Sequence, residues 1–339
     1  MKKWKGAIQF GSLLLISYLG FFLAHKYNYY LKDGSTVIND AKRRALENGT
    51  FEPDQRRTVI FFVGNSRILS GFVPEVFDSL NQGRTQSFNL ALGGTEVMDG
   101  LVMLSQASVQ PDVIVLQYPW SEAYVPGEVS GEVLDMDDIV PFKDLFKDML
   151  LFAGRARSQG YSLSDYYRIS REINTNMLAT RGYYFIEGQA LYDDFRLPPD
   201  FTMAGDDTTL VERVEPPLSG ANYAWIQAYC ARHDIELVLG SEFRRYNERK
   251  PATPADYVNR AELAQQPRLH VTPGPPYYVM DNQYFSDAVH LNPTGARLWT
   301  ARMHQDIAPL IDQLVAKTAQ KKSQQTSQQG TLYGKAQAQ

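Results

Sequence analysis

The feature that most constrains the fold is an alternation of short apolar runs with longer helical patterns. The clearest run, Thr58 to Val63, is β-branched and aromatic and ends at Gly64, which is typical of a buried strand. Further strands are indicated at 85–90, 112–117, 235–239 and 268–272, and helical patterns fall at 73–81, 96–108, 219–233 and 294–315. This alternation predicts an α/β fold in which helices cover both faces of a parallel sheet.

The alternating part of the chain, residues 57–316, is long enough for one domain with a sizeable core. The segment before it, 31–56, is polar and partly helical in pattern, and we interpret it as a stalk. The segment after it, 317–339, is rich in Gln, Ser, Lys and Thr. It has too few apolar residues to offset the entropy cost of ordering, so we expect a disordered tail.

A long break, residues 119–217, separates the third and fourth predicted strands. A connection of this length needs its own structure or a function, and we interpret it as a partly helical cap insertion over the strand ends. Its aromatic residues either form a small core or stack on sugars. They include Tyr161, Tyr166, Tyr167, Tyr183, Tyr184, Phe185, Tyr192 and Phe195. The Pro- and Tyr-rich segment 251–284 is expected to form a second wall.

The N-terminus carries a basic and then an apolar segment. Three lysines within the first five residues precede the stretch from Ala7 to Ala24, which contains no charged residue. That length suits a helix that spans a membrane, and the positive charge before it favours a cytoplasmic N-terminus. We therefore expect residues 1–30 to anchor the chain and the rest to lie outside, with a cleaved signal peptide as the alternative.

The composition excludes several classes of function. The formal net charge of −4 argues against a general nucleic-acid surface. The only cysteine, Cys230, rules out an internal disulfide framework. No His and Cys set has zinc spacing, and the acidic pairs lack the spacing of a calcium loop. We therefore predict no metal and no cofactor.

A candidate nucleophile follows the first predicted strand. Gly64 permits a sharp turn, and Ser66 on such a turn projects its hydroxyl at the carboxyl end of the strand, where open α/β sheets bind ligands. Unpaired N–H groups of the helix that follows suit a developing negative charge. The alternative is that Ser66 only caps this helix, which is a common role for serine.

A candidate base lies far along the chain. His290 follows Asp287 by three residues, so one turn of chain supplies both side chains. A neutral imidazole can take the proton of a serine hydroxyl near pH 7, and a carboxylate can hold the ring in the required tautomer. The alternative is a histidine near a helix start with the aspartate as cap. Together with Ser66, the pair favours catalysis.

Paired glycines follow the second predicted strand. The segment from Ser87 to Thr95 reads Ser-Phe-Asn-Leu-Ala-Leu-Gly-Gly-Thr and precedes a predicted helix. Glycines let backbone N–H groups approach a ligand closely, as an oxyanion hole requires. A plain strand-to-helix turn is the alternative.

These segments resemble the SGNH hydrolase (GDSL esterase/lipase) superfamily. The family has a Gly-Asp-Ser nucleophile block, which Gly64-Asn65-Ser66 matches with Asn in place of Asp. Asp287 and His290 match its late Asp-x-x-His block in full. The resemblance implies a flavodoxin-like three-layer α/β fold with a central parallel sheet. It also implies Ser66 as nucleophile, His290 as base and Asp287 as the partner of the base.

The family's two remaining blocks bear on the oxyanion hole. Asn89 and Gly94 match its Asn-x-Gly-x-x-Gly block, although Ala91 replaces the middle Gly. The resemblance implies oxyanion or substrate contacts from this block, with the N–H groups of Ser66 and Gly94 as donors. The Gly-x-Asn-Asp block is the departure, because the strand that ends at Gln117 continues into Tyr-Pro-Trp without an Asn. Losing one donor costs roughly 3 kcal/mol of transition-state stabilisation.

Arg67 directly follows the candidate nucleophile. Its guanidinium could bind a carboxylate or sulfate group on a substrate. An arginine at such a place is otherwise a solvated helix residue or the partner of a nearby acid. The sequence leaves these interpretations open.

The expected function is that of a membrane-anchored, extracytoplasmic enzyme. Ser66 would attack an acyl ester, most simply an acetyl ester, and water or a sugar hydroxyl would complete hydrolysis or transfer. The anchor places the catalytic domain on the periplasmic or extracellular side of the cell inner membrane and favours an envelope polysaccharide or other glycan as substrate. Some members of the superfamily are O-acetyltransferases beside a membrane-bound acyl donor system, so such a protein is an expected partner. A non-catalytic envelope protein that binds a glycan or a membrane partner is the alternative, and the missing Asn supports it.

Overall fold

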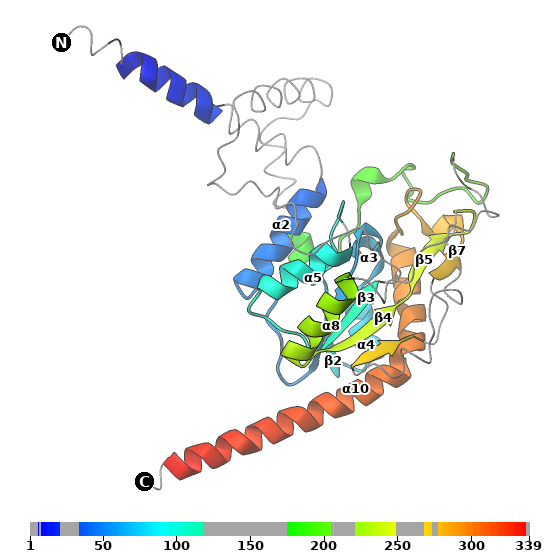
Figure 1. Cartoon of the computed structure of the whole chain (residues 1–339). Helices are drawn as coiled ribbons and strands as arrows, with labels where there is room; N and C mark the ends of the chain where they lie inside the picture. The colour runs from blue at the N-terminus through cyan, green and yellow to red at the C-terminus, as the bar shows by residue number, and fades with distance from the viewer. Residues whose placement is uncertain are drawn as a thin grey trace. The chain divides into compact units, whose positions relative to one another are not determined.

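The computed structural model divides the chain into two compact units, Met1–Ala41 with Val129–Thr175, and Lys42–Glu128 with Asn176–Gln339. The second unit contains all of the predicted site residues and the sheet, several of whose strands are labelled in Figure 1. The structure describes residues 6, 8–20, 34–95, 97–117, 175–204, 206, 221–248, 268–272 and 277–336.

A five-stranded parallel sheet forms the centre of the second unit. Its strands lie in the order β2-β1-β3-β4-β6, which is the order of the flavodoxin-like sheet. The strands are β1 (Thr58–Val63), β2 (Thr85–Asn89), β3 (Val113–Gln117), β4 (Glu236–Gly240) and β6 (Leu269–Val271). The predicted α/β fold with a parallel sheet is therefore confirmed, and each strand ends within one residue of its expected position.

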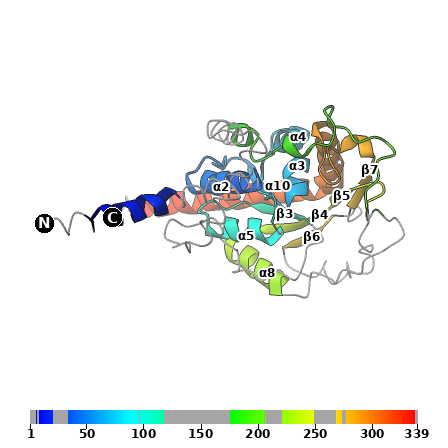
Figure 2. The ribbon, with the colours of Figure 1, turned by 90° about the horizontal axis from the view of Figure 1, so that it is seen from above.

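Helices cover both faces of the sheet, as the alternating pattern predicts. Figure 2 shows α5 and α8 on one side of the strands and α3, α4 and α10 on the other. The helices are α3 (Ser66–Gly71), α4 (Pro74–Leu80), α5 (Val97–Gln106), α8 (Ala221–His233) and α10 (Pro293–Ala336).

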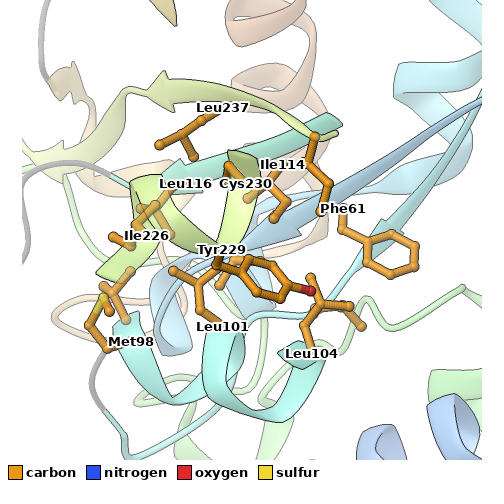
Figure 3. Close-up of a cluster of buried hydrophobic side chains, with 14 of the residues drawn as sticks. Phe61, Met98, Leu101, Leu104, Ile114, Leu116, Ile226, Tyr229, Cys230 and Leu237 are labelled. Carbon is orange, nitrogen blue, oxygen red and sulfur yellow. The ribbon is translucent and has the colours of Figure 1, made fainter. Parts of the chain in front are cut away.

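The apolar core on the α5 and α8 face is built from alternate residues of the central strands. Figure 3 shows Met98, Leu101 and Leu104 of α5 and Ile226 and Tyr229 of α8 directed toward the strands. The strand residues beneath them include Phe61, Ile114, Leu116 and Leu237, and all of these side chains are buried. Burial of an aromatic or aliphatic side chain of this size contributes about 1.5–3 kcal/mol.

A second aromatic cluster fills the opposite face. Phe62 of β1 stacks on Phe72 with ring centroids 3.5 Å apart, and both rings contact Phe77 edge-on. The buried Trp299 of α10 packs against Phe243 at 5.2 Å. These contacts hold α3 and α10 close to the carboxyl ends of the strands.

A two-stranded parallel sheet follows β4 and was not expected. It pairs β5 (Glu242–Arg245) with β7 (Tyr277–Met280). The predicted second wall, 251–284, therefore includes β6, β7 and the short 3-10 helix Asn282–Tyr284. Residues 251–267 and 273–276 of that wall lie outside the described residues.

The predicted stalk requires a correction, because helix α2 (Gly34–Glu47) and the residues after it contribute to the core. Ala45, Leu46 and Phe51 belong to the buried apolar cluster on the α5 and α8 face. Phe51 also packs against Phe88 of β2 at 5.3 Å. The folded domain therefore begins before residue 57, because these side chains are buried in its core. The sequence did not indicate this, because the apolar residues are spaced along an otherwise polar segment.

The predicted disordered tail, 317–339, is also corrected, because α10 continues as a helix to Ala336. Pro309 lies inside this helix and does not end it. Lys322 forms an ion pair with Asp112 at 3.0 Å, and Lys317 pairs with Glu236. These ion pairs with residues just before β3 and at the start of β4 stabilise a segment whose composition alone suggests disorder.

Two other predicted segments lie mostly outside the described residues. Of the cap insertion, 119–217, the structure describes only 175–204 and 206. Of the predicted anchor, 1–30, residues 1–5, 7 and 21–30 lie outside the described residues, whereas residues 6 and 8–20 are helical. Among the described residues, the structure contains no helix with both the length and the apolar character needed to cross a membrane.

Candidate active site

Ser66 opens the short helix α3, directly after the turn that ends β1. The cap of this helix is Asn65, whose side-chain oxygen accepts a hydrogen bond from the N–H of Arg67 at 3.0 Å. Ser66 is therefore the first helical residue and not the cap, and its half-buried side chain is left for another role. Its own N–H belongs to the first turn of α3, where N–H groups have no acceptor within the helix.

The turn before Ser66 is held by the end of strand β3. Gly64 has no room for a side chain, because a Cβ there would lie 2.5 Å from both Gln117 Oε1 and Ile68 Cγ1. The same Gln117 oxygen accepts a hydrogen bond from the N–H of Asn65 at 2.8 Å. Gln117, the last residue of β3, thus fixes the backbone that carries Ser66.

Asp287 and His290 form a hydrogen-bonded pair in the turn that precedes α10. Asp287 Oδ2 lies 2.7 Å from His290 Nδ1. The other carboxylate oxygen accepts the N–H groups of Val289 at 2.8 Å and of His290 at 2.7 Å. The side chains of His290 and Asp287 are only 8% and 11% exposed. The aspartate therefore positions both the backbone and the ring of His290.

The electrostatics of this pair favour an ionised Asp287. Burial raises the pKa of the Asp287 carboxyl, but its hydrogen bonds and the charge of His290 lower the pKa by a larger amount. The pKa of Asp287 therefore lies below its ordinary value. An ionised carboxylate only accepts hydrogen bonds, so we assign the proton of neutral His290 to Nδ1. Its Nε2 is then an acceptor, and it is buried without a hydrogen-bond partner among the described residues. A general base requires such an unpaired nitrogen.

The segments that carry Ser66 and His290 are far apart in the sequence but pack together in the fold. Helix α3 packs against α10, which begins three residues after His290. Thr300 of α10 donates its hydroxyl to the carbonyl of Gly71 in α3 at 3.2 Å. Within the described part of the chain, no hydrogen bond joins the Ser66 hydroxyl to His290 Nε2. Catalytic hydrogen bonds are often long without substrate and shorten when the substrate binds.

The loop after β2, which contains Gly94, runs beside the Ser66 turn. The N–H of Leu90 donates to Phe62 at 2.8 Å, and the N–H of Leu92 donates to Gly64 at 3.0 Å. Gly94 follows with a left-handed φ of +64° and is exposed. Its backbone is therefore accessible close to the turn that carries Ser66.

Asn89, in contrast, is a structural residue. Its Nδ2 donates to the carbonyls of Ile68, Leu69 and Phe72 at 2.8, 3.2 and 2.9 Å. Its Oδ1 accepts the N–H of Ala91 at 3.1 Å, and the side chain is fully buried. These bonds satisfy the carbonyl groups at the end of α3 and fix the next loop. They correct the expectation that Asn89 contacts the substrate, since its polar atoms are used within the fold.

Arg67 is also held within the fold. Its guanidinium pairs with Glu242 at 3.1 Å and with Glu248, and its side chain is 12% exposed. Burial lowers the pKa of Arg67, but the charges of Glu242, Glu248 and Asp287 raise it above its ordinary value. The structure therefore favours the alternative in which Arg67 pairs with nearby acids over the one in which it binds a substrate. The charge of Asp287 also raises the pKa of Arg67, so Asp287 lies near the residue that follows Ser66.

Lys42 is a buried residue near the site that sequence reasoning missed. Its Nζ donates to the carbonyl of Ala91 at 2.6 Å and lies 3.4 Å from Asn89 Oδ1. Burial lowers the pKa of Lys42 well below its ordinary value. No local signal marks this lysine, because it lies in a polar helical segment and its partners are more than forty residues away.

The returning end of the predicted cap contacts the turn that carries the base. The N–H of Leu191 donates to Ser286 at 2.9 Å, and the N–H of Leu197 donates to Phe285 at 3.1 Å. Both acceptors directly precede Asp287 in the chain. This part of the cap is therefore hydrogen-bonded to the two residues that lead into the Asp287–His290 turn.

The aromatic residues of this segment were expected either to form a small core or to stack on sugars, and the structure describes only some of them. Phe185 and Phe195 pack edge-to-face at 5.3 Å and form part of a small core. Tyr192 is 43% exposed and can contact a ligand. Tyr161, Tyr166 and Tyr167 lie outside the described residues.

Within the described ranges, no group of three or more His, Cys, Asp or Glu side chains is arranged to hold a metal ion. Comparison of the chain with models of protein families, with curated proteins and with solved structures found no match. The chemical interpretation therefore rests on the residues of this chain.

Proposed function

We propose that the chain is a membrane-anchored, extracytoplasmic serine enzyme of SGNH type that hydrolyses or transfers an acyl group on a cell-envelope polysaccharide or other glycan. The observation that carries the proposal is the His290 imidazole, which Asp287 orients at 2.7 Å and whose Nε2 is buried without a partner. A buried histidine with a purely structural role is expected to have both ring nitrogens hydrogen-bonded. Ser66, in the first turn of α3, supplies a hydroxyl at the carboxyl edge of the sheet.

The proposed reaction proceeds through an acyl-enzyme. Ser66 Oγ attacks the carbonyl carbon of the ester and gives its proton to His290 Nε2. The tetrahedral intermediate expels the alcohol, which takes the proton from Nε2. Water or a sugar hydroxyl then loses its proton to Nε2 and attacks the acyl group, and Ser66 regains its proton as it leaves. Asp287 stabilises the imidazolium in both halves of the reaction.

Stabilisation of the oxyanion is the weakest part of the proposed site. The N–H groups of Ser66 and Gly94 would bind the negative oxygen, and the segment after β3 lacks the Asn that supplies the family's third donor. A site with two donors in place of three loses roughly 3 kcal/mol of transition-state stabilisation. We therefore expect slow turnover on simple esters.

The N-terminal helix supports the proposed membrane anchor. Its apolar side chains are exposed by about half or more, including those of Ile8, Phe10, Leu13, Leu14, Leu15, Ile16 and Leu19. An apolar helix surface that is exposed among the described residues suits the interior of a bilayer. An enzyme anchored there would act on surface glycans and could receive acyl groups from a membrane-bound donor protein.

The alternative function is a non-catalytic envelope protein that binds a glycan or a membrane partner. It is favoured by the absence of the family's Asn in the segment after Leu116, and by the lack of a hydrogen bond between Ser66 and His290. In such a protein the exposed Tyr192 of the cap segment would contact a sugar while Ser66 stays unreactive.

The test is release of p-nitrophenol from p-nitrophenyl acetate by the full-length chain in detergent, with and without added oligosaccharide. We expect turnover in the wild type that Ser66→Ala abolishes. Ser79→Ala, an exposed serine in α4, is the matched control and should leave the rate unchanged. Faster release with oligosaccharide, together with an acetylated sugar product, would identify transfer. Equal rates in the wild type and in folded Ser66→Ala would reject the enzyme and favour the binding protein.

A further inference from the structure

Besides Lys42, Arg245 at the end of β5 is a fully buried cation to which the proposed chemistry gives no role. Its Nε donates to the carbonyl of Ala288 at 3.1 Å. Its two terminal nitrogens bind both carboxylate oxygens of Asp206, at 2.8 and 2.6 Å. An arginine is the only side chain that can donate to a carbonyl and grip a carboxylate with two parallel bonds at once.

The carbonyl that Arg245 binds lies inside the turn that holds the base. Ala288 stands between Asp287 and His290, and the Asp287 carboxylate accepts the N–H groups of Val289 and His290 from the other side. The turn is thus fixed by an acceptor for its N–H groups and by a donor for its carbonyl. Loss of this donor would remove the hydrogen bond that the half-buried Ala288 carbonyl accepts and leave the turn held only through its N–H groups.

Arg245 is itself held in one orientation. Besides Asp206, the ring of Phe201 lies 5.1 Å from its guanidinium carbon. Burial raises the pKa of Asp206, but the hydrogen bond from Arg245 lowers it below its ordinary value, so the pair is ionised. Phe201 and Asp206 come from the returning end of the predicted cap, which therefore holds the arginine against the turn.

The other charged side chains near Arg245 and Asp206 form ion pairs with one another. Arg67 and Arg244 both pair with Glu242 and Glu248. Glu248 also accepts the backbone N–H of Arg245 at 3.2 Å. The Arg245 side chain is therefore directed away from these acids and toward Asp206 and Ala288.

We propose that Arg245 is a positioning residue that holds the Asp287–His290 turn through the Ala288 carbonyl, and that Asp206 holds Arg245 for this task. The proposal rests on the proposed function, since it assigns the arginine to the orientation of the general base. It also makes Phe201 and Asp206, from the predicted cap, part of the structure that sets the geometry of His290. A lysine cannot replace the arginine, because a single ammonium lacks the planar fork that bridges both partners.

The test compares Arg245→Lys, Asp206→Asn and the control Arg181→Lys in the full-length chain. Arg181 also pairs with a largely buried aspartate, Asp78, but binds no part of the turn. We expect Arg245→Lys to lower kcat on p-nitrophenyl acetate by about 10²-fold, the cost of a misplacement near 1 Å, with KM almost unchanged. Asp206→Asn has one acceptor oxygen, so it keeps one hydrogen bond from Arg245 to a neutral group in place of two to a charged one and should lower kcat about tenfold. Arg181→Lys should keep the wild-type kcat.

A second measurement reads the turn without any substrate. The proton between His290 Nδ1 and Asp287 gives a proton resonance far downfield of the amides, and His290→Ala assigns it by its loss. We expect this resonance to shift or broaden in Arg245→Lys and to stay in place in Arg181→Lys. Urea unfolding confirms that each variant is folded, and a misfolded Arg245→Lys leaves Asp206→Asn to carry the comparison.

The outcomes separate the two proposals. An active wild type with unchanged kcat and an unchanged downfield resonance in folded Arg245→Lys would overturn the positioning role and leave the enzyme in place. An inactive wild type whose resonance still depends on Arg245 would overturn the proposed function while supporting the hold of Arg245 on the turn. A loss of kcat with unchanged resonance would also overturn the positioning role, because the effect would then not pass through His290.

Discussion

Replacing Asp287 by asparagine tests how the structure holds His290. The carboxylate accepts the N–H groups of Val289 and His290 with one oxygen and faces His290 Nδ1 with the other. Asparagine keeps the shape and one oxygen, which can still accept the two backbone N–H groups. Its amide NH2 then faces Nδ1 and can only donate, so Nδ1 becomes an acceptor and the ring proton moves to Nε2.

The expected loss follows from that change of tautomer. A ring protonated at Nε2 cannot take the proton of Ser66, and the wrong tautomer lowers turnover by roughly 10⁴-fold, or about 5.4 kcal/mol of transition-state free energy. The fold should lose less, about 1.5–3 kcal/mol, because only one charge-assisted hydrogen bond disappears from a largely buried site. The variant should therefore be folded and almost inactive.

The assay is hydrolysis of p-nitrophenyl acetate at neutral pH, with urea unfolding to measure the stability of each variant. Asp281→Asn is the matched control, since this carboxylate lies six residues earlier in the chain and is exposed. It should retain wild-type turnover. A folded Asp287→Asn protein with turnover within about tenfold of the wild type would refute the assigned tautomer and the role of Asp287.

Two further predictions concern the fold around the site. Burial lowers the pKa of Lys42 well below its ordinary value of 10.5, so the unfolded chain binds more protons than the folded one between these two pKa values, and stability rises with pH across that window. Urea unfolding at several pH values should show this rise in the wild type and its loss in Lys42→Met; equal slopes in the two proteins would contradict the burial of a titrating lysine. Gly182 has φ +95° and a Cβ there would overlap the Asn89 carbonyl, so Gly182→Ala should cost more than about 3 kcal/mol in urea unfolding. Gly49→Ala, with φ +74° and open space around it, should cost only about 1–2 kcal/mol, and equal losses would exclude the steric part of this reasoning.

The sheet could be predicted from the sequence because its strands are short, apolar and bounded by turns. Strand β1 is buried at every position, and a short continuous apolar run of this kind is typical of a strand in a parallel sheet that helices cover on both faces. Asp287 and His290 could be predicted as a pair because they are three residues apart, so their contact is local. The same holds for Gly64, whose role depends on the turn that it occupies.

The remaining residues could not be predicted because their roles depend on contacts between distant segments. The sequence leaves the role of Arg67 open and contains no sign of a role for Arg245, because their partners Glu242 and Asp206 come from distant segments or from the cap. Strand β5 itself reads Glu-Phe-Arg-Arg, which lacks the apolar pattern of a strand. Lys42 reads as part of a polar helix, although the loop after β2 buries it.

The most direct test of the account is labelling of the full-length chain by a fluorophosphonate probe, with the adduct located by mass spectrometry. The account predicts a single adduct on Ser66, absent in Ser66→Ala and formed roughly 10²–10⁴-fold more slowly in His290→Ala. A folded wild-type protein that forms no adduct, or one whose labelling is the same in Ser66→Ala, would contradict it.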